Sequence, residues 1–191
     1  MAAVPPSVES TVEATVEPRV EATADATVEP RVEPRVEPTL EPTAEPAALL
    51  QDDDWREWMC AQAVARFATL NRHGAPHLVP VVFVLHDAAL WLPVDGKPKR
   101  TANLARLDNL RRDRRCAMLF DLYSADWQAL RWLRLDGAGE VVALTDTLAA
   151  TLTAAFGRKY PQYGVIAPLT APPTAIRFTW RSASRWRAGV A

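Results

Sequence analysis

The spacing of apolar residues predicts a helix at the point where the folded part of the chain begins. In "DDDWREWMCAQ", Trp55, Trp58 and Met59 recur at intervals of three and one residues, as on the buried face of a helix. Three aspartates at residues 52–54 precede or overlap the first turn, where a carboxylate can cap free backbone N–H groups. A helix is therefore expected to start here.

The apolar pattern then changes to that of strands. "RFATLNR" and "HLVPVVFVLH" flank the turn "HGAP" and predict a hairpin, and "AALWLPV" predicts a third strand. Residues 78–85 are apolar nearly throughout, so we expect both faces of that strand to be covered. Pro80 lies inside it and requires an edge, a bulge, or a place where something other than a strand meets the backbone.

The second half of the chain alternates helix and strand signals. Leucines at residues 104–110 form one helical stripe with Thr101 as its expected cap, and "RCAMLFDLY" predicts a fourth strand. "ALRWLRLDGAGEVVAL" predicts one long strand or a bent pair around Gly137, and "TAIRFTWRSASRWR" a final strand. "DTLAATLTAAFGRKY" predicts a helix that is capped by Asp146 and ends near Gly157. About six strands with few, segregated helices indicate an antiparallel barrel in the α+β class.

The first 50 residues have a different pattern, in which an acid recurs every fourth position from Glu9 to Glu45. Six prolines between residues 18 and 46 exclude one continuous helix, and large apolar side chains are nearly absent. We therefore predict a disordered, extended tail over residues 1–50 and one domain over residues 51–191. A docking arm for a basic partner, or for the chain's own basic face, is the alternative role for the tail.

Charge is divided unequally between these two parts. The chain carries a net charge of −1, but residues 1–50 hold ten acids and three arginines, a net charge of −7. The remaining residues hold 13 acids and 19 cations, a net charge of +6. A domain with such a bias is suited to an anionic ligand or to nucleic acid.

The cysteines and the N-terminus indicate a cytoplasmic protein. Cys60 and Cys116 are far apart and lack metal-ligand spacing, so we expect free thiols rather than a disulfide or a metal site. The N-terminus has no secretion signal, and no stretch approaches the length of about 18 apolar residues that a membrane span requires.

The cations are concentrated around the turn "DGKPKRT". Lys97, Lys99 and Arg100 are expected to stand just before a helix N-terminus, where N–H groups and the helix dipole already favour an anion. Thr101 could add its hydroxyl, so the turn has the composition of a phosphate site. The arginines of residues 111–115 fit the alternative, a solvated face, because cations at the C-terminal end of a helix also suit its dipole.

The motifs resemble a known family. "GAPHLVPVVF", a basic turn and helix, and "NLRRDRRCAML" resemble the split-barrel flavin and deazaflavin enzymes related to pyridoxamine 5′-phosphate oxidase. "DGKPKRTANLARLDNL" and "DLYSADWQALRWLRLDGAGEVV" are similar to the branch of probable coenzyme F420-dependent oxidoreductases of actinobacteria. The resemblance spans residues 56–188, and the tail has no counterpart in it.

This resemblance implies a six-stranded split β-barrel that forms a homodimer with two cofactor sites between the subunits. Arg106 stands where the wider superfamily usually has a lysine, three residues before an Asn-Leu pair. The implied cofactor-binding residues are Lys97, Lys99, Arg100, Thr101, Arg106 and Asn109 at the phosphate, Val79, Pro80 and Val81 along the ring, and Trp127, Trp132 and Arg134, from the same or the other subunit. A barrel core or a dimer contact is the alternative role for the tryptophans.

The implied activity is hydride transfer between coenzyme F420 and a small, fairly apolar organic substrate. It requires no catalytic side chain and no metal, because the protein contributes binding, orientation and exclusion of water. A flavin mononucleotide (FMN) enzyme on the same barrel and a cofactor-binding protein without turnover are the alternatives. Nucleic-acid binding is not favoured, since the aromatic residues are not interleaved with the cations. His77 lies near the expected groove and could face the ring.

Overall fold

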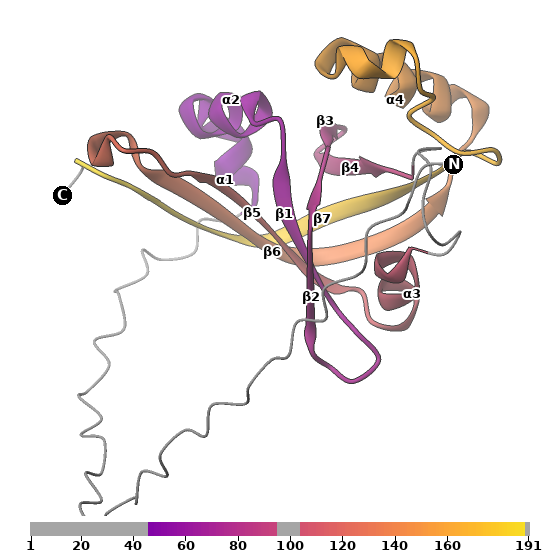
Figure 1. Ribbon diagram of the computed structural model, residues 1–191, viewed down its shortest axis with the longest axis horizontal. Coiled ribbons are helices and arrows are strands. Elements are labelled where there is room, and N and C mark those ends of the chain that lie inside the picture. Colours follow the sequence, from indigo (N-terminus) through magenta and orange to yellow (C-terminus); the bar gives the residue numbers. More distant parts are fainter. Residues whose placement is uncertain (1–45, 95–103, 190–191) are drawn as a thin grey trace, which may run out of the picture. The chain divides into compact units, whose positions relative to one another are not determined.

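The computed structural model describes residues 46–94 and 104–189. Its centre is one antiparallel sheet with the strand order β2-β1-β5-β6-β7-β4-β3 (Figure 1). The strands are β1 (Ala65–Leu70), β2 (Pro76–Val81), β3 (Val84–His86), β4 (Ala89–Pro93), β5 (Arg115–Leu122), β6 (Arg131–Ala143) and β7 (Thr174–Arg187). The helices are α1 (Pro46–Gln51), α2 (Asp53–Ala61), α3 (Ala105–Arg112) and α4 (Asp146–Lys159), with short 3₁₀ turns η1 (Trp127–Ala129) and η2 (Pro161–Gly164).

The predicted hairpin of β1 and β2 is confirmed. The two strands pair along their whole length, from Ala65 opposite Val81 to Leu70 opposite Pro76. Gly74 closes the turn with a φ of +78°, a left-handed conformation that favours glycine, and its N–H donates to the Asn71 carbonyl. The mainly antiparallel, mainly β character expected from the sequence is therefore observed.

The strand count differs from the prediction, because the apolar run of residues 78–85 is two strands and not one. After Val81 the chain leaves β1, passes through Phe83 and pairs with β4 from Val84 onward. In the described part of the sheet the two edge strands, β2 and β3, are not paired with each other. The seven strands therefore form an open sheet, consistent with a split barrel. The expectation that both faces are covered is also wrong, since Leu78 is 62% exposed.

Pro80 lies on the free edge of β2, which is one of the placements expected from the sequence. Pro76 and Pro80 are four residues apart on β2, so their backbone groups point to the same side of the strand, and neither has an N–H to donate to β1. The N–H groups of Val79 and Val81 therefore face β1, while the carbonyl groups of the two prolines face outward. The edge thus offers mainly acceptors and resists pairing with a further strand.

Helix α2 begins as the sequence predicts. The Asp52 carboxylate accepts a hydrogen bond from the Trp55 N–H at 3.3 Å and also pairs with Arg185 of β7. Trp55 and Trp58 are buried in an edge-to-face contact, and the Arg131 guanidinium lies 4.3 Å from the centre of the Trp58 ring. These contacts attach α2 to the ends of β6 and β7.

Replacing Asp52 with alanine should lower the free energy of unfolding by about 1–2 kcal/mol, because the cap and the Arg185 pair are both lost. Asp53→Ala is the control and should cost less than about 0.5 kcal/mol, since its pair with Arg56 is exposed.

Burial alone would raise the pKa of Asp52, but hydrogen bonds from Arg185 and Trp55 outweigh it and lower the pKa. The stabilisation is therefore present at neutral pH and should be lost as the pH falls below about 3.8 through the folded pKa. Urea unfolding of both variants across that pH range checks this.

Three element boundaries depart from the sequence prediction. Helix α3 begins at Ala105 with Leu104 as its N-cap, which forms no side-chain cap bond, so the helix starts four residues beyond Thr101. Helix α4 is capped by the Thr145 hydroxyl and continues through Gly157 to Lys159. Helix α1 begins within the segment assigned to the tail, so the described fold begins at Pro46.

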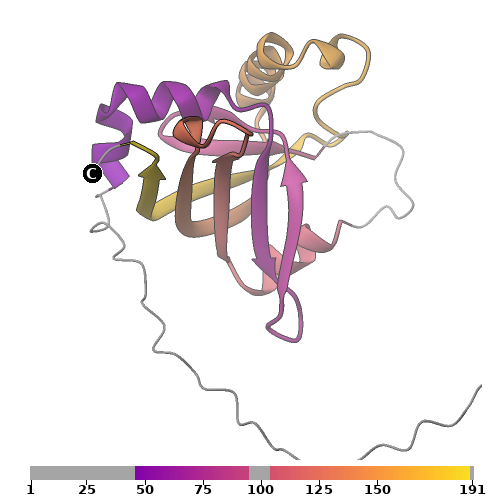
Figure 2. The ribbon, with the colours of Figure 1, turned by 60° about the vertical axis from the view of Figure 1, so that its left-hand side comes forward.

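The helices divide the apolar interior into two clusters. The main cluster fills the curved sheet and includes Phe67, Phe83 and Phe120. The second lies between α4 and strands β3 and β4, and includes Leu152 and Phe156. Figures 1 and 2 show α2 and α3 toward opposite ends of β1, with α4 beside β3 and β4.

Candidate functional site

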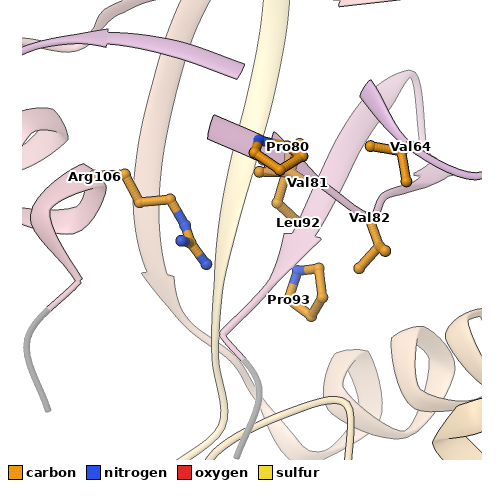
Figure 3. Close-up of a pocket in the computed structure, with 7 residues that line it drawn as sticks. All are labelled: Val64, Pro80, Val81, Val82, Leu92, Pro93 and Arg106. Atoms are coloured by element: carbon orange, nitrogen blue, oxygen red, sulfur yellow. The ribbon is translucent and has the colours of Figure 1, made fainter. Parts of the chain in front are cut away.

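A cavity of about 220 Å³ lies where the chain passes from β2 to β3, and we name it the Arg106 cavity. One of its walls comes from the end of β2 and the residues after it, another from the end of β4, and a third from α3 (Figure 3). The seven lining residues are Val64, Pro80, Val81, Val82, Leu92, Pro93 and Arg106. Among the described residues, one cationic side chain thus faces lining side chains that are otherwise apolar.

Arg106 projects from the first turn of α3 toward the cavity (Figure 3). The Nε atom of its guanidinium is buried. Helix α3 is held against the sheet by close packing, since Leu110 lies directly over Gly139 of β6. A Cβ atom on Gly139 would come within 2.8 Å of Leu110 Cδ2. Glycine at this position allows the approach that fixes α3, and with it Arg106.

Two of the three predicted ring-lining residues reach this cavity. Pro80 and Val81 line it, whereas Val79 packs against the main apolar cluster. Alternation along β2 explains the exposed Pro80 and the buried Val81, and the break after Val81 adds Val82 to the wall. No local pattern of apolar residues marks this break, so Val82 and Val64 were not predicted from the sequence.

Asn109 is engaged inside the fold. Its side chain is 5% exposed and donates to the Thr69 hydroxyl at 2.9 Å, while its amide oxygen accepts from Arg112 at 3.2 Å. These bonds join α3 to β1 and orient the helix. The structure therefore gives Asn109 a positioning contact beside the cavity, and its predicted contact with phosphate stays a prediction.

The arginine run after Asn109 forms ion pairs and hydrogen bonds within the domain. Arg111 pairs with Asp108 at 3.0 Å and Arg115 with Asp113 at 2.6 Å, and Arg114 pairs with Glu140. The Arg112 guanidinium donates to the Leu70 carbonyl at 2.7 Å. Hydrogen bonds from Arg115 lower the pKa of the Asp113 carboxyl to about 2. These contacts favour the solvated-surface interpretation for the run.

Trp132 and Arg134 lie in a different cavity, of about 440 Å³, on the outer face of β5 and β6, which we name the Trp132 cavity. They are five to seven residues along β6 from Gly139, which places them roughly 17–24 Å from the strand position beneath α3. Trp127, on η1, is 74% exposed. Within one chain, these residues therefore do not share the Arg106 cavity.

Lys97, Lys99, Arg100 and Thr101 lie outside the described residues. The segment that contains them joins Val94 to Leu104. Pro93 and Arg106, which are described on either side of this segment, both line the Arg106 cavity.

Several other titratable side chains are half-buried. Burial lowers the pKa of Lys159 to about 8, and its ammonium lies 3.4 Å from the centre of the Phe83 ring. Burial raises the pKa of Cys60 and raises that of Cys116 to about 12, so both free thiols are protonated at neutral pH. His77 lies opposite Thr69 and on the same side of β2 as Val81, and its buried Nδ1 has no hydrogen-bond partner among the described residues.

Within residues 46–94 and 104–189, no cluster of three potential metal ligands occurs. No helix in these ranges is long and apolar enough to cross a membrane.

The model of the pyridoxamine 5′-phosphate oxidase family matches residues 51–187. The chain belongs to this family. The match covers the sheet and all of the helices from α2 to α4, so both the Arg106 cavity and the Trp132 cavity lie inside the family domain. No curated protein matches the chain.

Several solved structures are similar in fold. A conserved hypothetical protein from Mycobacterium tuberculosis has a TM-score of 0.55 and 20% identity, over 71% of this chain and 84% of that one. HutZ, a heme storage protein from Vibrio cholerae, has a TM-score of 0.55 and 14% identity, over 73% and 96%. An FAD-binding protein from Mesorhizobium loti has a TM-score of 0.50 and 17% identity, over 69% and 89%. At these identities the likeness establishes the shared fold alone.

Proposed function

We propose that this protein is an oxidoreductase that uses coenzyme F420, and that the Arg106 cavity forms part of its cofactor site. The observation that carries the proposal is one guanidinium projecting toward an apolar wall at a strand edge rich in backbone acceptors. A ring system can lie against Pro80 and Val81, while an anionic group on the same ligand meets Arg106. Membership of the pyridoxamine 5′-phosphate oxidase family supports a flavin-type cofactor.

The charge of the domain favours a deazaflavin over FMN. Coenzyme F420 carries a phosphodiester and a glutamate tail, and residues 51–191 carry a net charge of +6. Lys97, Lys99, Arg100 and Thr101 would contribute to the phosphate site together with Arg106, as the sequence motif implies. FMN on the same barrel is the second candidate, because its single phosphate could also pair with Arg106.

A second copy of the chain would complete the site. The Arg106 cavity is smaller than the range of about 300–1,000 Å³ that is typical of ligand pockets, so it needs a further wall. The Trp132 cavity offers one, since Trp132, Arg134, Leu122 and Trp186 lie together on the outer sheet face, where Trp186 is 47% exposed. The proposed homodimer covers this apolar surface and brings Trp127, Trp132 and Arg134 of one subunit to the cofactor of the other.

The chain's own residues would bind and orient, and the cofactor would supply the redox chemistry. When bound in reduced form, a deazaflavin supplies a hydride to an activated double bond or a similar acceptor. Arg106 would hold the anionic part of the cofactor, and Pro80, Val81 and Val82 would fix one face of the site and keep water from it. A proton for the product would come from solvent.

The proposal is tested by rapid mixing of the protein and reduced coenzyme F420 with a panel of enones and quinones. We expect single-turnover oxidation of the cofactor with at least one acceptor, faster than in protein-free solution. Saturable binding without oxidation across the panel would instead identify a cofactor-binding protein without turnover. Protein that purifies yellow, with tightly held FMN, would favour the second candidate.

A further inference from the structure

Phe83 lies between the end of β2, which lines the Arg106 cavity, and the start of β3. It follows Val82, which lines the cavity, and precedes Val84, where β3 begins. It lies outside the pairings of both β2 and β3, yet it is fully buried. Its backbone N–H and C=O therefore need partners from elsewhere in the fold.

Tyr160 supplies both partners with a single hydroxyl group. The Phe83 N–H donates to the Tyr160 oxygen at 3.0 Å, and the hydroxyl donates to the Phe83 carbonyl at 2.9 Å. Tyr160 lies at the C-terminal end of α4, 77 residues further along the chain, and is 6% exposed. Burial raises the pKa of Tyr160 to about 12, so the hydroxyl keeps its proton and can donate and accept together.

The same turn of α4 also contacts the Phe83 side chain. The Lys159 ammonium lies over one face of the ring, and Phe120 meets the ring edge-to-face with centroids 5.0 Å apart. Phe83 is thus held through its backbone by the second apolar cluster and through its ring by the main one. Tyr160 itself is packed inside the fold, as a member of the second apolar cluster.

We propose that Tyr160 is the positioning residue of the cofactor site. Its hydroxyl fixes the backbone of Phe83, and this holds Val82 and the end of β2 as the wall against which the cofactor ring lies. The inference rests on the proposed function of the Arg106 cavity. The inference adds that α4 determines the shape of the Arg106 cavity, although no residue of this helix lines it.

The test uses the full-length protein and the variants Tyr160→Phe and Leu152→Ala. Tyr160→Phe keeps the ring and its packing against Phe156 but removes both hydrogen bonds to Phe83. Leu152→Ala is the control, because it destabilises the same helix from a fully buried position but leaves both hydrogen bonds between Tyr160 and Phe83 in place. Hydrogen exchange of the amides of residues 81–84 and equilibrium binding of coenzyme F420 and of FMN are measured where all three proteins are folded.

We expect Tyr160→Phe to speed exchange at the Phe83 amide at least tenfold and to weaken binding of the preferred cofactor at least fivefold. Leu152→Ala should leave exchange at Phe83 and the binding constant within twofold of wild type. Unchanged exchange in Tyr160→Phe, or equal weakening of binding in both variants, would overturn the positioning role. If the wild type bound neither cofactor, the proposed function would fail, and exchange at residues 81–84 alone would decide whether Tyr160 holds this wall.

Discussion

Replacing Gly137 with alanine is expected to lower the free energy of unfolding by about 3–5 kcal/mol, a large part of the roughly 5–15 kcal/mol of a typical domain. Gly137 lies at the irregularity in the β6–β7 pairing, directly against the backbone of β7. A Cβ atom there would lie 2.7 Å from the Trp180 Cα and closer still to the Thr179 carbonyl oxygen. Backbone cannot move aside as a flexible side chain can, so the longest strand pair in the sheet must distort.

Gly157→Ala is the matched control for this prediction. Gly157 lies in α4, and a Cβ atom added there meets nothing within 4 Å. Because alanine favours a helix over glycine, this variant should gain up to about 1 kcal/mol. Thermal and urea unfolding of the two variants should therefore shift in opposite directions. A Gly137→Ala protein as stable as the wild type would show that β6 and β7 do not approach as described.

Joint replacement of Lys97, Lys99 and Arg100 by glutamine is expected to weaken cofactor binding by about 10²- to 10³-fold at low salt. The expectation rests on their charge and on their place in the chain between Pro93 and Arg106, which both line the cavity. Charge-assisted hydrogen bonds each contribute about 1.5–3 kcal/mol, and screening reduces the sum for exposed groups. Fluorescence titration with coenzyme F420 measures the change.

A second triple variant removes three positive charges from another part of the domain. It distinguishes a specific phosphate site from a general effect of net charge on affinity. Arg111, Arg114 and Arg115 each have a carboxylate partner within the domain, so their joint change to glutamine should weaken binding only about threefold through long-range attraction. Equal losses in the two triple variants would mean that overall charge, and not a phosphate site in the turn, controls affinity.

Local signals in the sequence predicted the parts of the fold that depend on local chemistry. Strand β7 has the predicted bounds, the β1–β2 hairpin turns at Gly74, and Asp52 caps α2, because alternation, turn glycines and capping carboxylates act within a few residues. The leucine stripe of α3 is likewise buried at Leu107 and Leu110.

The prediction from the sequence was wrong where one apolar run contributes residues to two different apolar clusters. Residues 78–85 read as one covered strand, but Leu78 faces outward, Phe83 enters the main cluster and Val84 enters the second. No local pattern encodes a change of partner from β1 to β4. The start of α3 was not predicted for a related reason, since its N-cap residue, Leu104, forms no side-chain cap bond that a sequence motif would mark.

The candidate site was predicted in part for the same physical reason. Arg106, Pro80 and Val81 come together because the basic helix and the proline-containing strand are both marked in the sequence. Val64, Val82 and the supporting Tyr160 are ordinary apolar or aromatic residues, and only the tertiary fold gives them a place at the cavity. Trp132 and Arg134 lie on a separate surface, and this motivates the proposed partner subunit.

The cofactor site is tested most directly by titrating coenzyme F420, and FMN in parallel, into the wild type, Arg106→Gln and Arg111→Gln. Both variants remove one positive charge from α3, but only Arg106 lines the cavity. We predict that Arg106→Gln binds the preferred cofactor about 10- to 100-fold more weakly, as the loss of one charge-assisted contact implies, and that Arg111→Gln stays within twofold of wild type. Undiminished binding of both cofactors by Arg106→Gln would contradict the assignment of this cavity to the cofactor.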